Sequence, residues 1–203
     1  MKMETNKEDF VKYIFTDNGS VLRTKTLRNN GLSSRDIKKL TDKGIIEQVR
    51  WGYYRLSDES SFSDIQVLIT LFPDGVLYLE SALDHYGYTE RTPAAWKIAV
   101  DEKTSRTRFR IPYPKVEPHF ISSAKFPIGI TETTIEGTEI KIYDRERTIC
   151  DCLLHRNKMD PEVFNQAIQA YLKDNNRREY VLAEYASKLR VMRKVKEVLG
   201  IWL

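Results

Sequence analysis

Residues 20–56 read SVLRTKTLRNNGLSSRDIKKLTDKGIIEQVRWGYYRL, and this stretch decides the fold expected for the first part of the chain. It carries nine basic and three acidic residues, a net charge of +6 in 37 residues, whereas the whole chain of 203 residues carries only +4. The excess of positive charge is therefore local. A local cluster of lysine and arginine is typical of a surface that binds phosphate groups.

The stretch begins with the pattern of two short helices. The first is predicted over 24–29 and ends at Asn30-Gly31, two residues that tolerate a positive φ angle. Ser33 is the predicted N-cap of the second helix, which covers 34–42 and carries apolar residues on one side.

A β-hairpin is predicted after the second helix. Its strands, Ile45–Val49 and Tyr53–Leu56, flank Arg50-Trp51-Gly52, a turn that contains glycine. Helix, tight turn, helix and hairpin form the layout of a winged helix-turn-helix, whose second helix enters the major groove of DNA. We therefore expect DNA binding. Two alternatives stay open: a basic helix pair that is simply solvated, or a winged helix that binds a protein.

Nine residues are candidate DNA contacts: Lys25, Arg28, Ser33, Ser34, Arg35, Lys38, Lys39, Arg50 and Trp51. Base edges and phosphates are the expected contacts of the residues at the start and on the exposed side of the second helix: Ser33, Ser34, Arg35 and Lys38. Those on the first helix are expected to contact backbone phosphates. The two at the hairpin tip are expected to enter a minor groove, where arginine is favoured. Packing against the hairpin is the alternative for the tryptophan, because tryptophan is usually well buried.

A domain boundary is predicted near residue 60. A helix over 7–16 would complete the core of the first domain with Phe10 and Ile14, helped by Val11 and Phe15. The run 57–61 is polar and predicts a linker. We therefore expect a winged helix-turn-helix domain over 1–58 and a larger domain over 59–203.

The second domain has the mixed pattern of an α/β domain, so the fold class expected for the chain is α+β. Helices are predicted from a capping box at Ser63 and Gln66, over 78–86, and from Asp144 onward. The later ones include a helix that starts at Asp160-Pro161 and another over 180–199. Strand candidates are 97–100, 108–111 and 119–121, followed by a hairpin of 133–135 and 139–143 around Glu136-Gly137.

Composition excludes several classes of protein. No stretch approaches the roughly 20 apolar residues that cross a bilayer, and the first nine residues lack the apolar segment of a secretory signal. We therefore expect a cytoplasmic protein that does not contact a membrane. Cys150 and Cys152 are expected to be buried thiols, because two cysteines with His155 do not supply the four ligands of structural zinc. No metal and no cofactor is expected.

Catalytic motifs are absent from the sequence. It has no glycine-rich phosphate loop, no G-x-S-x-G and no H-E-x-x-H. The carboxylate pairs Glu136/Glu139 and Asp144/Glu146 fall at a turn and at a helix start, where solvation and capping explain them. We therefore expect that the chain is not an enzyme.

The segment 142–153, IYDRERTICDCL, combines a strand end with a helix start. Asp144 is placed as an N-cap, and Arg147 reaches Asp151 at i+4. Together with SALDHYGYT at 81–89 and the pattern Leu40-x3-Gly44-Ile45-x4-Arg50-x-Gly52-x-Tyr54-x-Leu56, this segment resembles the AbiEi-like family of bacterial antitoxins. The resemblance spans almost the whole chain.

The resemblance implies an antitoxin of a type IV toxin–antitoxin, or abortive infection, system. Its winged helix would bind inverted repeats in double-stranded promoter DNA and repress the operon. Its second domain would counteract a nucleotidyltransferase-like toxin, often without a stable complex. The family motif maps to Tyr143, Asp144, Arg145, Arg147, Thr148 and Asp151. Their expected role is to fix the strand-to-helix junction, with a direct part in toxin counteraction as the alternative.

The last part of the chain is also basic. Residues 177–203 contain seven basic and three acidic residues, and Leu189, Met192, Val195, Leu199 and Trp202 are spaced to face a core. The opposite face can bind nucleic acid or an acidic toxin surface, or can simply be solvated. Two other functions remain as alternatives: a stand-alone transcriptional regulator whose second domain senses a ligand or partner, and an enzyme acting on nucleic acid.

Overall fold

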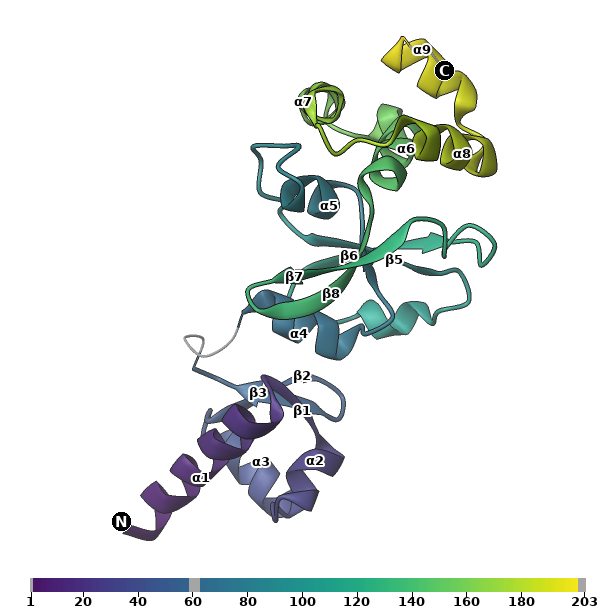
Figure 1. The fold of residues 1–203 in the computed structure, drawn as a ribbon. Helices are drawn as coiled ribbons and strands as arrows, with labels where there is room; N and C mark the ends of the chain where they lie inside the picture. Colours follow the sequence, from purple (N-terminus) through teal and green to yellow (C-terminus); the bar gives the residue numbers. More distant parts are fainter. Residues whose placement is uncertain (1, 59–62, 201–203) are drawn as a thin grey trace. The chain divides into compact units, whose positions relative to one another are not determined.

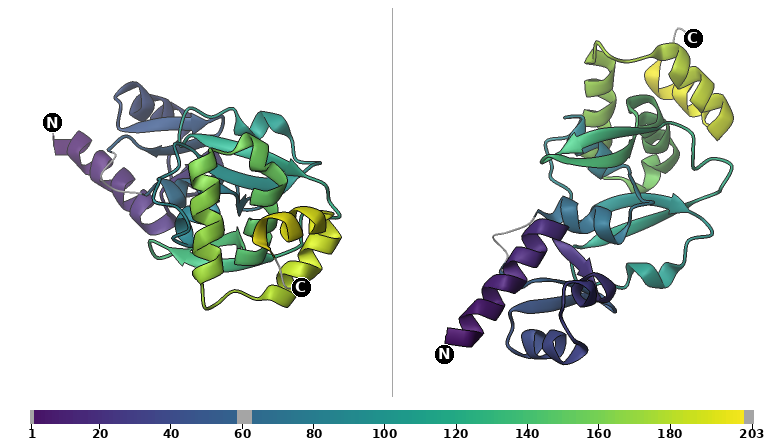
Figure 2. Two further views of the ribbon diagram at one scale, coloured as in Figure 1. Left: turned by 90° about the horizontal axis from the view of Figure 1, so that it is seen from above. Right: turned by 60° about the horizontal axis from the view of Figure 1, so that its bottom comes forward.

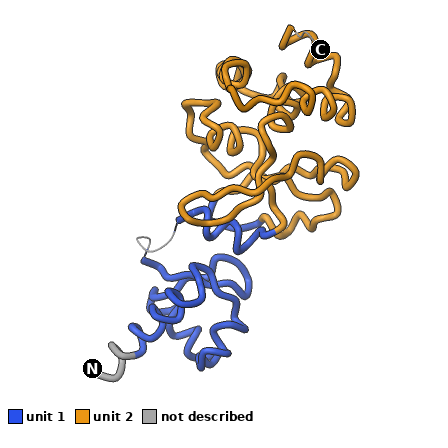
Figure 3. The backbone as a smooth tube through the Cα atoms, in the orientation of Figure 1, with its two compact units in different colours: residues 1–73, 110–114 blue, residues 74–109, 115–203 orange. Residues whose placement is uncertain are grey.

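The computed structural model describes residues 2–58 and 63–200 and divides the chain into two compact units. Unit 1 comprises residues 1–73 and 110–114, and unit 2 comprises residues 74–109 and 115–203 (Figure 3). The architecture is mixed α+β, with a three-stranded sheet in unit 1 and a five-stranded sheet in unit 2 (Figure 1). Most of the predicted linker, Glu59 to Ser61, lies outside the described residues.

Unit 1 is built around a small core beneath a three-stranded antiparallel sheet of order β1-β3-β2. Its elements up to residue 56 are α1 (Lys2–Asn18), β1 (Val21–Arg23), α2 (Thr24–Asn29), α3 (Ser34–Asp42), β2 (Ile46–Arg50) and β3 (Tyr53–Leu56). The core combines apolar residues from helices and sheet: Val11, Ile14, Phe15, Leu22, Leu27, Leu32, Ile37, Leu40, Ile46 and Leu56. The two predicted helices and the hairpin are confirmed, and β1 is a strand that the pattern did not predict.

The helix ends of unit 1 follow the expected chemistry. The Ser33 hydroxyl accepts a hydrogen bond from the Asp36 backbone N–H, and the Asp36 carboxylate accepts one from the Ser33 N–H, which completes a capping box. Gly31 and Gly44 have φ angles of +88° and +70° directly after α2 and near the end of α3.

One core residue of α1 was predicted wrongly. Phe10 is 44% exposed, whereas Val11, Ile14 and Phe15 are buried. At 100° per residue, Phe10 lies about a quarter turn from the centre of the stripe that these three residues form. The Phe10 side chain therefore lies at the border of the buried face of α1 and does not enter the core.

Unit 1 also contains α4 (Asp64–Leu71), which begins at the predicted place. Its capping box is not formed: the Ser63 side chain makes no capping bond. The Gln66 backbone N–H donates to the Ser63 carbonyl oxygen instead, at 3.1 Å. The helix is held by its buried face, which consists of Ile65, Val67, Leu68 and Leu71.

Unit 2 has a mixed sheet of order β6-β5-β4-β8-β7. Its strands are β4 (Val76–Leu77), β5 (Trp96–Asp101), β6 (Val116–Ile121), β7 (Ile130–Ile135) and β8 (Thr138–Tyr143). The β5–β6 and β4–β8 pairs are parallel, and the β4–β5 and β7–β8 pairs are antiparallel. The predicted hairpin turn is confirmed, with Glu136 and Gly137 at φ angles of +50° and +75°.

Helices cover one side of this sheet (Figures 1 and 2). They are α5 (Glu80–His85), α6 (Arg145–His155), α7 (Pro161–Lys173), α8 (Glu179–Leu189) and α9 (Met192–Leu199), with the short 3₁₀ turn η3 (Arg156–Lys158). A second 3₁₀ turn, η2 (Arg106–Phe109), connects β5 and β6. α7 starts at Asp160-Pro161 as predicted, and Asp160 caps it by accepting from the backbone N–H groups of Glu162 and Val163.

Three predictions for unit 2 were wrong in detail. The helix predicted over 78–86 starts only at Glu80, because β4 and Leu79, with a φ angle of +43°, precede it. The strand predicted over 108–111 is the 3₁₀ turn η2, in which Phe109 packs edge-on against Phe120. The helix predicted over 180–199 is broken at Arg190, whose φ angle is +64°.

A search for helices long and apolar enough to cross a membrane found none within residues 2–58 and 63–200.

Candidate nucleic-acid interface

The exposed face of α3 carries three cations. Arg35, Lys38 and Lys39 are exposed, while Ile37 and Leu40 on the opposite side of the helix are buried. Within the described part of the chain, these three cations form no ion pair with a carboxylate. The helix therefore presents unneutralised positive charge on the side that faces away from the core.

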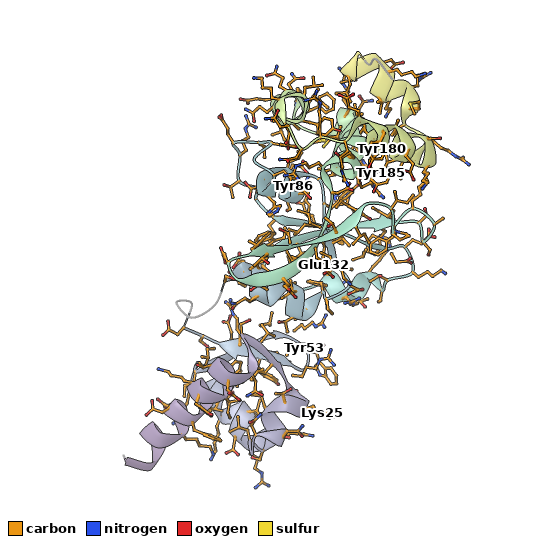
Figure 4. All side chains as sticks on the ribbon, in the orientation of Figure 1. Lys25, Tyr53, Tyr86, Glu132, Tyr180 and Tyr185 are labelled. Carbon is orange, nitrogen blue, oxygen red and sulfur yellow. The ribbon has the colours of Figure 1, made fainter. Side chains whose placement is uncertain are left out.

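The first turn of α3 is tied to α2. The Arg28 guanidinium donates to the Ser34 hydroxyl at 2.5 Å, and Lys25 is exposed on the same helix, where Figure 4 labels it. The Ser33 hydroxyl is used by the capping box, at 2.6 Å from the Asp36 carboxylate. Ser33 therefore orients α3, and a base contact from this hydroxyl would require the cap to open.

Two acidic residues belong to α3: Asp42 is exposed, four residues after Lys38, and Asp36 lies beside the three cations and is paired. Lys7 of α1 donates to its carboxylate at 2.6 Å. The hydrogen bond from Lys7 and those from Ser33 hold the pKa of Asp36 far below its usual range. The carboxylate is therefore charged at neutral pH and is matched by a lysine from another helix.

The tip of the β2–β3 hairpin carries the exposed tryptophan of unit 1. Trp51 is 92% exposed, so packing against the hairpin is excluded as its role. The neighbouring Arg50 is half-buried, with its guanidinium carbon 4.1 Å from the centre of the Tyr53 ring. Arg23 lies over the same ring at 5.2 Å, and Figure 4 labels Tyr53 on the hairpin.

Of the nine candidate DNA contacts, all except Arg50 are exposed, and all lie within unit 1. They belong to three neighbouring features: α2, α3 with its cap, and the hairpin turn. These features are chemically suited to bind a polyanion. They supply cations on α3, further cations on α2 and an exposed aromatic ring at the hairpin tip.

The motif around residues 143–151 forms a second constellation, and it is mostly buried. The Arg147 side chain is 1% exposed and donates from Nε to Asp151, whose side chain is 2% exposed, at 2.8 Å. Its Nη1 donates to the carbonyl oxygens of Lys125 and Ile128 at 2.8 and 2.7 Å. The guanidinium also lies over the Tyr143 ring, 4.2 Å from its centre.

The other motif residues close the junction between β8 and α6. Asp144 caps α6 by accepting from the Arg147 N–H at 2.9 Å. Buried Thr148 donates to the Tyr143 carbonyl oxygen at 3.3 Å, and Tyr86 donates to the same oxygen at 2.9 Å. Arg145 donates to Asp174 at 2.8 Å. The predicted N-cap and the Arg147–Asp151 pair are confirmed, and the pair is buried rather than at the surface.

Sequence reasoning missed the partners of this motif. Arg178 donates to the buried carboxylate of Glu146, at 2.5 Å from Nη2, and to Asp144 at 2.9 Å. Tyr185, labelled in Figure 4, also donates to Asp144. Burial raises the pKa of Asp144 above its usual range, although the hydrogen bond from the Arg147 N–H and the charge of Arg178 partly offset this effect. These partners are far away in the chain, so no local spacing could have identified them.

The two thiols flank Asp151 in α6, and His155 is the last residue of the same helix. Cys150 and Cys152 are buried, as predicted, and burial raises the pKa of each thiol. The His155 ring lies near Tyr78 and His119, with ring centres 6.2 and 6.0 Å away. His119, His155 and Tyr78 therefore form a cluster of three rings.

The basic carboxyl-terminal region differs from α3. Three of its cations are paired with carboxylates of the same region: Arg177 with Glu179, Lys188 with Glu184, and Arg193 with Glu197. Lys194 donates to the Leu154 carbonyl oxygen. Leu189, Val195 and Leu199 are buried as predicted, and Trp202 lies outside the described residues. Local pairing therefore neutralises three of the seven cations of this region, and Arg178 is paired with the distant Asp144 and Glu146.

Comparison with solved structures shows that the fold has been seen before. No family model matches the chain, and no curated protein matches it. The crystal structure of the Rv2827c protein from Mycobacterium tuberculosis is similar, with a TM-score of 0.58 and 13% sequence identity. The similarity covers 94% of this chain and 79% of that one. At this identity the likeness shows that the two chains share a fold.

Proposed function

We propose that unit 1 is a winged helix-turn-helix that binds double-stranded promoter DNA, with α3 as the recognition helix and the β2–β3 hairpin as the wing. The observation that carries this proposal is the exposed face of α3. Arg35, Lys38 and Lys39 stand there without carboxylate partners among the described residues, on a helix capped by Ser33. Such a helix fits the major groove, where arginine and lysine bind guanine edges and phosphates.

The remaining contacts follow from this orientation. Lys25 and Arg28 on α2 bind backbone phosphates, which fix the register of the protein on the duplex. Arg50 and Trp51 at the wing tip enter the adjacent minor groove. The 92% exposure of Trp51 supports this role, since the hairpin leaves the ring available for a partner. Two copies of the chain would occupy the two halves of an inverted repeat.

We further propose that the chain is the antitoxin of a type IV toxin–antitoxin, or abortive infection, system. The support is the resemblance of its 143–151 motif and of its amino-terminal pattern to AbiEi-like antitoxins. In this proposal the carboxyl-terminal domain counteracts a nucleotidyltransferase-like toxin in the cytoplasm, and unit 1 represses the operon. The burial of Arg147 and Asp151 supports a structural role for them, so the toxin-directed surface consists of other, exposed residues.

The test uses the full chain in bacteria that carry two reporters. One is growth after induction of the nucleotidyltransferase-like gene expected beside this chain's own gene. The other is expression from the promoter of that operon. Wild type is expected to restore growth and to repress the promoter. The Arg35→Ala/Lys38→Ala variant is expected to restore growth while losing repression, because it lacks two of the three α3 cations and leaves unit 2 unchanged.

Two outcomes would contradict these proposals separately. If the neighbouring gene is toxic, both proteins accumulate and the full chain does not restore growth, the antitoxin function is wrong. If the double variant represses as strongly as wild type, α3 is not the recognition helix.

A further inference from the structure

Strand β7 forms one outer edge of the five-stranded sheet of unit 2, and β6 forms the other. A strand at an outer edge has one row of backbone N–H and C=O groups that no neighbouring strand uses. Such a row can pair with another extended chain. Proteins prevent this pairing with proline, bulges, short strands, charged side chains or a covering segment. The edges of this protein differ in these protections.

The β6 edge is protected by its sequence and by its neighbour. Pro118 in the middle of the strand supplies no backbone N–H, and the Phe109 ring of η2 packs edge-on against Phe120 of β6. The edge strands of the unit 1 sheet are also poor templates. β1 has only three residues, and β2 has a register shift between Gln48 and Arg50.

Strand β7 lacks most of these protections. It is six residues long, contains no proline and pairs with β8 without a register shift. Five of its residues are β-branched, a class that favours extended backbone. Its one charged residue, Glu132, is exposed and is labelled in Figure 4. The His85 ring lies 3.2 Å from the Thr133 hydroxyl, a contact with a side chain and not with the backbone of the edge.

The β7–β8 register shows which backbone groups of β7 face outward. Ile135 and Thr138 flank a two-residue turn, so they form a hydrogen-bonded pair, and such pairs recur at every second residue of an antiparallel ladder. The bond from the Asp144 N–H to the Gly129 carbonyl oxygen, of 2.8 Å, continues the same alternation. The backbone groups that point away from β8 are therefore those of Ile130, Glu132 and Thr134. Within the described part of unit 2, none of these groups has a hydrogen-bond partner.

A second copy of β7 fits this row in an antiparallel arrangement about a twofold axis. Only residues with outward groups can form the hydrogen-bonded pairs, and this limits the registers. An axis at Glu132 would set two carboxylates opposite each other, and an axis at Thr134 would set Glu132 opposite Glu136, which is unfavourable. An axis at Thr131 would pair only residues 130–132. An axis at Thr133 pairs residues 131–135 of both copies and sets Glu132 opposite a threonine.

We propose that β7 is a self-association surface, at which two copies of the chain join their unit 2 sheets through antiparallel β7 strands with Thr133 on the twofold axis. The occupant is a second copy because, in this register, the strand is complementary to itself in both hydrogen bonds and charge. A single pair of strands is a small interface, so the dimer is weak and depends on protein concentration.

The dimer carries two copies of unit 1, the number that the two halves of an inverted repeat take. The inference itself rests on unit 2 alone and goes beyond the proposed DNA binding. Its tests contain no DNA. A monomeric chain would therefore leave the proposed function standing, and a chain that binds no promoter would leave this inference standing.

The first test is sedimentation of the full chain over a wide range of concentrations, with thermal unfolding as the check on folding. Thr134→Pro removes an outward N–H and keeps every β7–β8 hydrogen bond, because the Thr134 N–H points away from β8. Thr134→Val is the matched control that keeps this N–H. Wild type and the valine variant are expected to shift from monomer to dimer as the concentration rises, whereas the proline variant stays monomeric. A wild type that stays monomeric throughout, or a folded proline variant that dimerises like wild type, overturns the inference.

The second test does not need the proline variant to fold. Thr133→Cys and Thr131→Cys are oxidised in parallel, and the native cysteines are buried. On the axis, the two Cα atoms of residue 133 lie about 4.5 Å apart, within disulfide range. The two copies of residue 131 lie roughly 13 Å apart along the strands.

A disulfide-linked dimer is therefore expected from Thr133→Cys and not from Thr131→Cys. Random collision would give the opposite order, because Thr131 is exposed and Thr133 is half-buried. Equal cross-linking of the two variants, or faster cross-linking at position 131, overturns the proposed pairing.

Discussion

Arg147 is the most heavily used side chain of the 143–151 motif. It pairs with Asp151, donates to two carbonyl oxygens of the chain that precedes β7, and lies over Tyr143. These contacts tie the start of α6 to the loop before β7 and to the end of β8. A cationic side chain buried in this way is tolerated only because its donors are matched by acceptors.

Gly129→Ala tests how closely the backbone approaches this arginine. A Cβ atom at Gly129 would lie 2.6 Å from Arg147 Cβ, and its φ angle is +79°. We expect a loss of about 2–5 kcal/mol in the free energy of unfolding, from steric overlap and backbone strain together. Urea unfolding of the full chain measures it.

Gly137→Ala is the matched control. Its φ angle is +75°, and no atom lies within 4 Å of an added Cβ. Only the backbone cost, about 1–2 kcal/mol, is therefore expected. Equal losses for the two variants would show that the contact between Gly129 and Arg147 is not tight.

Arg147→Met tests the buried ion pair. Removing the guanidinium leaves the Asp151 carboxylate without its partner, and we expect a loss of about 3–5 kcal/mol in the free energy of unfolding. The double variant Arg147→Met/Asp151→Leu should regain part of that loss, because it removes the uncompensated charge. If the double variant is less stable than the single one, the unpaired charge of Asp151 is not the cause.

Local spacing explains which of these contacts the sequence could predict. The Asp144 cap and the Arg147–Asp151 pair lie three and four residues apart, within the reach of helix rules. The Glu146–Arg178 contact joins residues 32 apart, and its formation depends on how α8 packs against α6. The burial of the Arg147–Asp151 pair has the same origin, since it follows from packing rather than from spacing.

Among the elements, α3 shows how a helix is positioned for an outside partner. Its capping box fixes the first turn, its buried side fixes its rotation, and Arg28 joins that turn to α2. The cations are thereby directed outward before any ligand binds. α4 has a serine at the same N-cap position but no side-chain capping bond.

Ser33→Ala and Ser63→Ala exploit this difference. Removal of the Ser33 cap should lower the free energy of unfolding by about 1 kcal/mol. Removal of the Ser63 hydroxyl, a buried group without a hydrogen-bond partner among the described residues, should change it by less than about 0.5 kcal/mol. Urea unfolding compares the two. A larger decrease at Ser63 than at Ser33 would contradict the capping geometry.

Elements marked by caps, glycine turns or proline were predicted well. The helices at Ser33, Asp144 and Asp160 and the hairpin at Glu136-Gly137 are examples. Two features without such marks were missed. The break at Arg190 requires a left-handed residue where the sequence offers no glycine, and the two-residue strand β4 is too short to show a period.

At the scale of the molecule, charge counts alone do not reveal function. Residues 20–56 and 177–203 are both strongly basic, with net charges of +6 and +4. The later region neutralises its cations in part through pairs at i and i+4, such as Lys188 with Glu184. Arg35, Lys38 and Lys39 on the α3 face form no such pairs within the described residues. Pairing, which depends on geometry, separates a candidate binding surface from a solvated helix.

The most direct test of DNA recognition by unit 1 is equilibrium binding of the full chain to its own promoter duplex and to an unrelated duplex. Wild type should prefer the promoter by a factor on the order of 10³ or more. Arg35→Ala/Lys38→Ala should weaken promoter binding by about 1–3 kcal/mol for each base that it no longer reads, and most of the preference should disappear. The control Lys158→Ala/Lys173→Ala, which removes two exposed lysines of η3 and α7, should keep the preference for the promoter. Wild type that binds both duplexes equally, or a double variant that keeps its preference, would contradict recognition by α3.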